Sequence, residues 1–325
     1  MINSMKRTLK KTKFSEQFEI TKEQNQLEFI DILVDMDVPL FISPWLISSS
    51  DCELSYKIEI TLKKYFEKLL VLISEREKEK AIELLMHLHE PKEIHMGYGN
   101  EKFYGKAIGR EKAEHLYDVF SKSKAAQTTL LSDICYSQLL IDGIGSDNIS
   151  DMIASICRGL FAEFTAQQCV LNGIKETYEV KLEVFDLNNE NWKIVEMKLP
   201  VYRGEHIILI PKRFISRDRY YSSKFDEYII KNKTIPELMT GKQLSSVTGL
   251  FRILKDKTKK PRLKACYAHY GKQKKDLFDH VVKYGDLPLI EFKKEIMEKY
   301  STLSDKEINN TVQKYLDGVF KNKLN

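Results

Sequence analysis

Residues 177–199 read TYEVKLEVFDLNNENWKIVEMKL, and this stretch decides the predicted fold. The runs 177–186 and 191–199 predict two β-strands, and the turn LNNEN between them predicts that the strands form a hairpin. A third strand is predicted at 206–211 and a helix near 223–231. Because a helix also precedes the hairpin, the predicted order of elements is α-β-β-β-α.

The helix ahead of the hairpin has the clearest periodicity in the chain. Its apolar side chains recur in steps of three and one, the stripe of period 3.6 that a core-facing helix needs. They are Ile149, Met152, Ile153, Ile156, Cys157, Leu160, Phe161 and Phe164. Asp147 is placed to cap the first turn, and Gly173 ends the helix.

The remaining elements follow from shorter patterns. Strands are predicted at 18–20, 27–34 and 37–47. Helices are predicted at 56–89 with a break near Ser74, at 111–121, 125–140, 274–284 and 287–300, and at 304–321 with Ser304 as N-cap. The glycine-rich stretch 91–110 predicts a loop.

Together these elements predict an α+β fold, with a mixed β-sheet core flanked by helices and a C-terminal helical region. The predicted divisions are a basic N-terminal arm at 1–17, an α/β core at 18–232, and a basic segment with helices at 233–325. The hairpin unit occupies about 148–231 of the core.

The composition is that of a globular protein, with 42% apolar and 30% charged residues in 325. The five cysteines are scattered without a C-x-x-C pair, which predicts reduced thiols and neither a disulfide framework nor a zinc site. The first residues lack the apolar run of a signal peptide, and no run of apolar residues is long enough to span a bilayer. We therefore expect a cytoplasmic protein that has no membrane partner.

Positive charge is concentrated in two segments of the chain. Residues 1–13 carry five basic groups and no acid, and 252–275 carries ten basic groups and one acid, Asp256. The net charge is +5, so these segments contribute +5 and +9 and the rest of the chain has 5 − 14 = −9. Such segregation favours a polyanionic partner.

Asp186, Glu196 and Lys198 are the candidate catalytic residues. Hydrolysis of a phosphodiester uses a divalent cation held by carboxylates, and a nearby lysine can stabilise developing charge or position water. Period 2 places Glu196 and Lys198 on one face of their strand, and a hairpin can bring Asp186 to the neighbouring strand end. Asp186 and Glu196 are therefore the predicted ligands of Mg²⁺ or Mn²⁺. The structural alternative is an exposed edge strand beside an Asp-Asn turn.

These residues resemble the PD-(D/E)xK nuclease superfamily, in which an Asp and a later (Asp/Glu)-x-Lys lie on adjacent strands of a restriction-endonuclease-like core. The resemblance covers Asp186, Glu196-Met197-Lys198 and the element order, and it departs from the family at Phe185, where Pro is frequent. In a second mapping Lys212 takes the lysine role, although Ile210 then stands at the carboxylate position. The resemblance also implies an acid from the preceding helix, for which Asp151 and Glu163 are available.

The chain also resembles uncharacterised bacterial proteins encoded among phage-defence genes. The resemblance rests on the turn from Gly143 to Asp151, which has the pattern G-I-G-x-D-x-x-S-D, and on the later I-P-K at 210–212. It implies a setting in antiviral defence or restriction, with a partner protein from the same operon.

The basic segment 252–275 is the predicted nucleic-acid interface, because it mixes cations with Tyr267, His269 and Tyr270. Its predicted contact residues are Lys255, Lys257, Lys259, Lys260, Arg262, Lys264, Lys272, Lys274 and Lys275. A solvated linker or a surface for a protein partner is the alternative interpretation. Farther upstream, Glu93 and His95 belong to a His/Glu-rich stretch whose spacing argues against a metal site.

Two functions remain open from the sequence. The first is a Mg²⁺-dependent DNA endonuclease. The second is a non-catalytic subunit, which can be a homo-oligomer, that binds nucleic acid or a partner protein.

Overall fold

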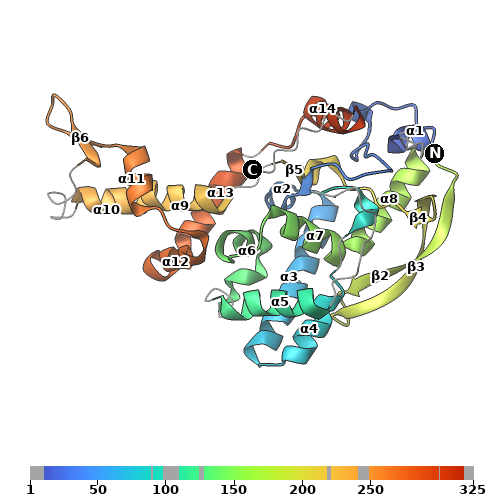
Figure 1. Cartoon of the computed structure of the whole chain (residues 1–325), viewed down its shortest axis with the longest axis horizontal. Coiled ribbons are helices and arrows are strands. Elements are labelled where there is room, and N and C mark those ends of the chain that lie inside the picture. Colours follow the sequence, from blue (N-terminus) through green and yellow to red (C-terminus); the bar gives the residue numbers. More distant parts are fainter. Residues whose placement is uncertain are drawn as a thin grey trace, which may run out of the picture.

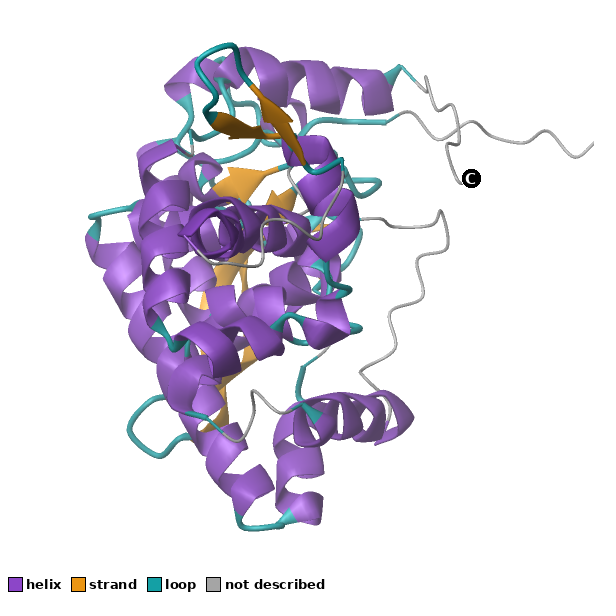
Figure 2. Ribbon diagram, turned by 90° about the vertical axis from the view of Figure 1, so that its left-hand side faces the viewer, coloured by secondary structure: helices purple, strands orange, loops and turns teal. Residues whose placement is uncertain are grey.

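The computed structural model describes residues 11–88, 91–97, 110–123, 128–217, 221–240, 249–299 and 301–317. Figure 1 shows a main body and, on one side of it, a projecting group of helices that ends at strand β6. In the view of Figure 2, helices lie in front of most of the strands, and Figure 1 shows β2 and β3 along the opposite edge of the main body. No helix of the described residues is both long and apolar enough to cross a membrane.

The predicted hairpin is confirmed. Strand β2 (Thr177–Asp186) pairs antiparallel with β3 (Asn191–Tyr202), in a register that runs from Thr177 opposite Pro200 to Asp186 opposite Asn191. The predicted third strand is confirmed only at its start, because β4 (Glu205–His206) is two residues long and the buried residues 207–210 continue outside the sheet.

The α+β class is confirmed, but the prediction of a mixed sheet is wrong for the described residues. Besides the order β2-β3-β4 there are two pairs of strands, β1 (Phe41–Ile42) with β5 (Ile215–Ser216) and β6 (Phe251–Ile253) with β7 (Lys259–Pro261). All of these pairings are antiparallel. Tight turns connect β2–β3 and β3–β4, and such short connections permit only antiparallel neighbours.

The single helix predicted before the hairpin is two helices, α7 (Ser146–Ile156) and α8 (Arg158–Leu171). Cys157 leaves the helical conformation between them, with φ −96° and ψ 16°. The break lets α8 take its own direction across β2, where a Cβ on Gly159 would lie 3.2 Å from Cγ1 of Val184. Helix α8 therefore packs close to the hairpin through a glycine.

The N-terminal strand predictions are largely wrong. Residues 18–20 and 27–34 form no strand, and the run 37–47 contains only β1 and helix α2 (Pro44–Ser49). The segment also holds α1 (Phe14–Gln17) and the 3-10 turn η1 (Gln24–Gln26). Its apolar side chains are buried as strand residues would be, but isolated bridges such as Phe29 to Pro211 replace a sheet.

The helical predictions in the first half are mostly confirmed. Helices α3 (Glu53–Ser74) and α4 (Lys78–Met86) separate where predicted, and α5 (Arg110–Lys122) matches its pattern. The pattern at 125–140 becomes the turn η4 (Thr129–Ser132) and helix α6 (Ile134–Leu140), and a further turn, η2 (Lys92–Ile94), lies near the start of the glycine-rich stretch 91–110. Residues 98–109 of that stretch lie outside the described residues.

The helices predicted at 223–231, 274–284, 287–300 and 304–321 are also confirmed in their described residues, and two further helices lie between the first two of them. A turn η5 (Lys212–Phe214) precedes α9 (Tyr221–Ile229), the π-helix η6 (Ile230–Thr234), α10 (Ile235–Thr240), α11 (Leu263–Tyr270), the turn η8 (Lys274–Asp276), α12 (Phe278–Tyr284), α13 (Leu287–Lys299) and α14 (Asp305–Leu316). We call the described residues from 221 to 299 the C-terminal lobe. The predicted cap is present, because Ser304 Oγ accepts a hydrogen bond of 3.3 Å from the Glu307 amide.

Trp45 of α2 joins the lobe to the main body. Its ring is fully buried, it stacks on Tyr221 of α9 at 5.0 Å between centroids, and it meets the edge of Phe292 of α13 at 5.9 Å. The indole Nε1 donates a hydrogen bond of 2.8 Å to Gln138 Oε1 of α6. One side chain therefore connects four helices.

We predict that Trp45→Ala lowers the free energy of unfolding by roughly 3–5 kcal/mol, because it leaves a large cavity and an unsatisfied Gln138. Urea denaturation followed by circular dichroism measures the change. Tyr56→Ala removes an aromatic ring that is 55% exposed on α3 and should cost much less. Equal losses in the two variants would contradict this role of Trp45.

Candidate functional site

The β2–β3 register separates the predicted catalytic residues. Glu196 is opposite Lys181, whereas Asp186 is opposite Asn191, so the two carboxylates are five residue steps apart along the hairpin. At 3.3 Å per residue this is a distance of about 16 Å along the hairpin. Because side chains alternate between faces, Asp186 also projects from the face opposite to that of Glu196 and Lys198. The expectation that these three side chains meet in one site is not met.

Asp186 holds the hairpin turn. Its carboxylate accepts a hydrogen bond of 2.7 Å from Asn189 Nδ2, and it forms an ion pair of 3.2 Å with Lys193, a neighbour on the same face. The contact with Lys193 and the hydrogen bonds from Asn189 and Asn188 hold the pKa of the Asp186 carboxyl below its ordinary value. The interactions are those of an Asp-Asn turn.

Glu196 and Lys198 belong to a charged, exposed face of the hairpin. Glu196 lies 3.8 Å from Lys181 Nζ, and Lys198 is the cross-strand partner of Glu179. Opposite charges face each other at both positions, which stabilises a two-stranded sheet modestly. Both residues thus have a structural role on this face.

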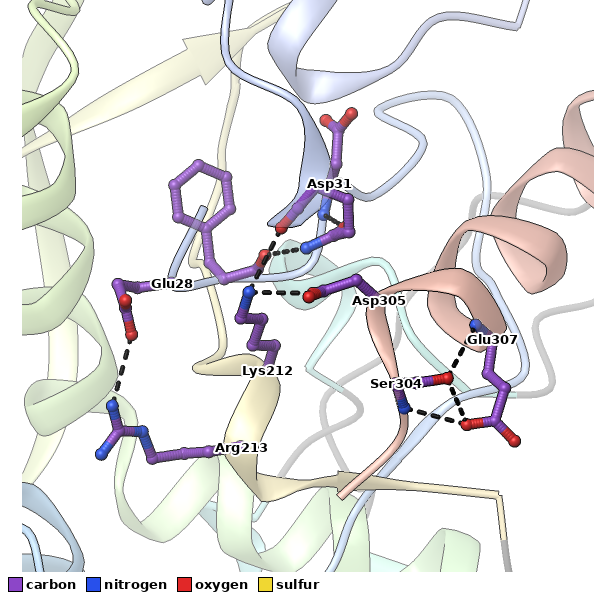
Figure 3. Close-up of polar contacts among 9 residues, drawn as sticks. Glu28, Asp31, Lys212, Arg213, Ser304, Asp305 and Glu307 are labelled. Atoms are coloured by element: carbon purple, nitrogen blue, oxygen red, sulfur yellow. Dashed lines mark hydrogen bonds and ion pairs between the residues drawn. The ribbon is translucent and has the colours of Figure 1, made fainter. Parts of the chain in front are cut away.

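The second mapping places Lys212 in a different contact (Figure 3). Lys212 lies in η5, and its Nζ donates hydrogen bonds to Asp305 Oδ1 of α14 at 2.8 Å and to the Gln24 carbonyl at 3.3 Å. The next residue, Arg213, forms an ion pair of 3.3 Å with Glu28. Lys212 therefore attaches the last helix to the N-terminal segment, while Asp151 lies within α7.

These positions give a direct test of fit for a metal ion. One ion cannot contact both Asp186 and Glu196, since they lie on opposite faces and far apart along the hairpin. Across the described ranges, no three Asp, Glu, His or Cys side chains converge in a group that could hold a metal. The predicted ligand pair does not fit Mg²⁺ or Mn²⁺.

A cleft of about 310 Å³ lies between the start of α3, the middle of α8 and η5, and no pattern in the sequence indicates it. Among its lining residues are Glu28, Cys52, Lys57, Glu163 and Arg213. Its size is at the lower limit of small-molecule sites, roughly 300–1,000 Å³. Glu163, the second acid that the nuclease resemblance makes available, lies in this cleft and not beside the β2–β3 hairpin turn.

Cys52 is the N-cap of the 22-residue helix α3 and the least buried of the five cysteines. Its sulfur accepts hydrogen bonds of 3.4 Å from the Ser50 hydroxyl and the Ser55 amide. Burial raises the pKa of this thiol, but these hydrogen bonds and the charge of Arg213 outweigh burial and bring the pKa below its ordinary value. The other four thiols are buried, and burial raises the pKa of each.

The first part of the predicted nucleic-acid interface 252–275 is a projecting β-ribbon, which we define as β6, β7 and the turn between them (251–261) (Figure 1), and the rest of the interface includes α11 and η8. The ribbon and the three residues that follow carry seven basic side chains and one acid, all of them exposed. The basic residues are Arg252, Lys255, Lys257, Lys259, Lys260, Arg262 and Lys264. Asp256 is used within the turn, where its Oδ1 accepts hydrogen bonds from the amide and hydroxyl of Thr258 at 3.0 and 2.6 Å.

Like charges oppose each other in this ribbon. Arg252 is the direct cross-strand partner of Lys260, a placement that destabilises an isolated ribbon. None of the seven basic side chains forms an ion pair with another described residue. The positive charge of the ribbon therefore has no partner in an ion pair within the described part of the chain.

Two of the predicted contact lysines make contacts inside the protein, one within the lobe and one with the main body. The Lys272 amide donates to Asp226 Oδ2 at 3.0 Å, and Asp226 Oδ1 lies 2.9 Å from His280 Nε2. Lys274 Nζ donates to the carbonyl of Ile144, and burial lowers the pKa of Lys274 to about 8. These two residues anchor the base of the basic segment, whereas Lys275 is exposed.

A buried polar cluster lies where η2, α8 and β4 meet. Arg158 and Glu93 form an ion pair of 2.7 Å with side chains 7% and 11% exposed. The atoms His95 Nδ1, Arg158 Nε and His206 Nε2 are buried without a hydrogen-bond partner among the described residues. The sequence directed attention to Glu93 and His95, but it gave no sign of Arg158, which lies 65 residues after Glu93.

Comparison with known proteins gives one match. A family model described as "Domain of unknown function (DUF8370)" matches residues 19–222. No curated protein and no solved structure matches the chain. The matched range covers the hairpin, the cleft and η5, and it ends within the first turn of α9, so the basic ribbon lies beyond it.

The buried histidines predict an acid-sensitive fold. Burial lowers the pKa of His95 to about 4, despite the nearby carboxylates Glu93 and Asp35, and burial also lowers the pKa of His206. An unfolded histidine, with pKa near 6.5, takes up a proton first, so stability is complete above pH 6.5 and falls as the pH drops towards 4. From His95 alone we expect a loss of about 2 kcal/mol between pH 7.5 and pH 5.

Denaturation at the two pH values measures this loss. His95→Asn is the informative variant, because asparagine tolerates the left-handed backbone at φ 50° and does not titrate. The pH dependence should be weaker in this variant and unchanged in the control His269→Asn on the exposed face of α11. Identical pH dependence in all three proteins would refute the role of His95.

Proposed function

We propose that this chain, which belongs to the family described as Domain of unknown function (DUF8370), binds nucleic acid through the basic ribbon of its C-terminal lobe. The observation that carries the proposal is the cross-strand pair Arg252 and Lys260. Two cations in direct opposition disfavour the ribbon unless an anion lies near both. A phosphate backbone supplies such anions at regular intervals.

The charge distribution supports a polyanion over a single small anion. Seven basic side chains occur between residues 252 and 264 with one acid, so the segment has a net charge of 7 − 1 = +6. The rest of the chain outside the two basic segments has a net charge of −9, which would repel a polyanion elsewhere and direct it to the ribbon. The resemblance to proteins encoded among phage-defence genes suggests the setting in which such binding would act.

Packing and hydrogen bonds within the lobe fix the position of the ribbon. The small core of Ile230, Ile235, Leu250 and Cys266 packs beneath it, and the Arg262 amide donates a hydrogen bond of 2.8 Å to the Leu250 carbonyl. Asp226 fixes the far end of the segment at Lys272. A binding surface that is already held in its folded conformation loses little conformational entropy when a ligand binds.

We predict opposite effects on binding and stability for Arg252→Ala/Lys260→Ala. Loss of two phosphate contacts should weaken binding to duplex DNA and reduce the slope of log K against log salt by about 2. The free energy of unfolding should stay the same or rise, because the substitutions remove like-charge repulsion. Fluorescence anisotropy over a salt series and urea denaturation provide the two measurements.

Lys63→Ala/Lys181→Ala is the matched control, since both lysines are exposed and lie on α3 and β2, away from the ribbon. Binding by this control should equal that of the unmodified chain. An unchanged salt slope in the ribbon variant would remove Arg252 and Lys260 from the interface.

A nuclease is the second proposal, supported by the order α8, β2, β3, β4, which follows the start of a restriction-endonuclease-like unit, although η5 and β5, which pairs with β1, then precede α9. Binding without catalysis predicts that plasmid and linear DNA stay intact with Mg²⁺, Mn²⁺ or EDTA, as gel electrophoresis would show. Cleavage that requires the metal would support the nuclease instead. If the variant Glu196→Ala/Lys198→Ala no longer cleaved DNA, those residues would be assigned to the reaction. Continued cleavage by this variant would exclude them.

A further inference from the structure

The basic ribbon has a second property besides charge, namely an exposed apolar side chain among the cations. Ile253 is 73% exposed, and its direct cross-strand partner is Lys259. Arg252 and Lys260 project from the other face, because side chains alternate along each strand. The ribbon thus carries cations on both faces and an isoleucine on one of them.

The aromatic residues of the segment do not offer a stacking platform for single-stranded bases. Tyr267 and Tyr270 of α11 pack, half-buried, against the small core of the lobe, together with Phe251. His269 is exposed, but its ring meets Tyr270 edge to face at 4.7 Å. Single-strand binding without sequence preference depends on freely accessible aromatic faces.

A duplex groove accounts for the ribbon better. Phosphates line both walls of a groove, so an element inserted between them needs cations on both of its faces. The major groove of B-form DNA, about 12 Å wide, admits a two-stranded ribbon, whereas the major groove of A-form RNA is too narrow for side chains to read. Within the groove, an apolar side chain can contact the methyl group of thymine.

We infer that the ribbon enters the major groove of double-stranded DNA, with Arg252, Lys259 and Lys260 contacting phosphates and Ile253 contacting thymine methyl groups. This inference rests on the proposed function, and it specifies the class of nucleic acid. Binding would also bury the apolar side chain of Ile253, which is exposed to water in the free protein, and this burial is favourable.

The experiment compares four probes of equal length and sequence: duplex DNA, the same duplex with uracil in place of thymine, single-stranded DNA and duplex RNA. The full chain should bind duplex DNA most tightly, and the loss of methyl groups should weaken binding. Ile253→Ser should weaken binding to the thymine duplex by roughly fivefold without a change in salt slope. On the uracil duplex the same variant should have little further effect.

Ile60→Ser on α3 is the control, because Ile60 is 55% exposed and lies far from the ribbon in the sequence. Equal affinity for single-stranded DNA or duplex RNA would overturn the groove assignment, as would an Ile253→Ser variant that binds thymine and uracil duplexes like the unmodified chain. Either result leaves the proposed function intact if Arg252→Ala/Lys260→Ala still weakens binding. Absence of binding to all four probes would overturn both proposals and favour a protein partner for the ribbon.

Discussion

The packing around the buried ring of Trp45 determines how the C-terminal lobe is placed against the main body. The ring stacks on the first residue of α9 and touches α13, so the lobe that carries the basic ribbon begins against the main body. The rest of the contact is apolar, and the hydrogen bond from the indole to Gln138 restricts the orientation of the ring. Other orientations would leave a buried N–H group without a partner, which costs free energy. The hydrogen bond and the ring contacts together fix the orientation of α2 relative to α6, α9 and α13.

The main body and the lobe differ in how their charged side chains are paired. In the main body, opposite charges are matched across short distances, as in Lys181 with Glu196 and Arg158 with Glu93. In the ribbon, Arg252 faces Lys260 and no described acid forms an ion pair with either. A folded protein gains nothing in stability from such a pair. Its presence on a well-supported ribbon is therefore better explained by a ligand than by folding.

Sequence alone predicted what local interactions determine. The hairpin and most helices follow from turn residues and periodicity, whereas the N-terminal strands failed because a buried apolar run does not by itself require a sheet. The three candidate catalytic residues do not meet because of the strand register. Residues paired across the hairpin lie on the same face, and the register pairs each even-numbered residue of β2 with an odd-numbered residue of β3, as in Asp186 with Asn191. Asp186 on β2 and Glu196 on β3 are both even-numbered, so their side chains project from opposite faces. The break at Cys157 accompanies the burial of Arg158 beside Glu93, a contact between distant segments that no local pattern reveals.

The last helix completes the attachment of the lobe. After α13 the chain returns to the main body, where α14 buries Ile308 and Val312 and places Asp305 on Lys212 (Figure 3). Arg217, just before α9, also donates to the Glu307 carbonyl and to Thr311 of α14. The lobe is therefore held near both of its ends, by Trp45 at α9 and by α14 after α13. The ribbon therefore projects from a lobe whose two ends both contact the main body (Figure 1).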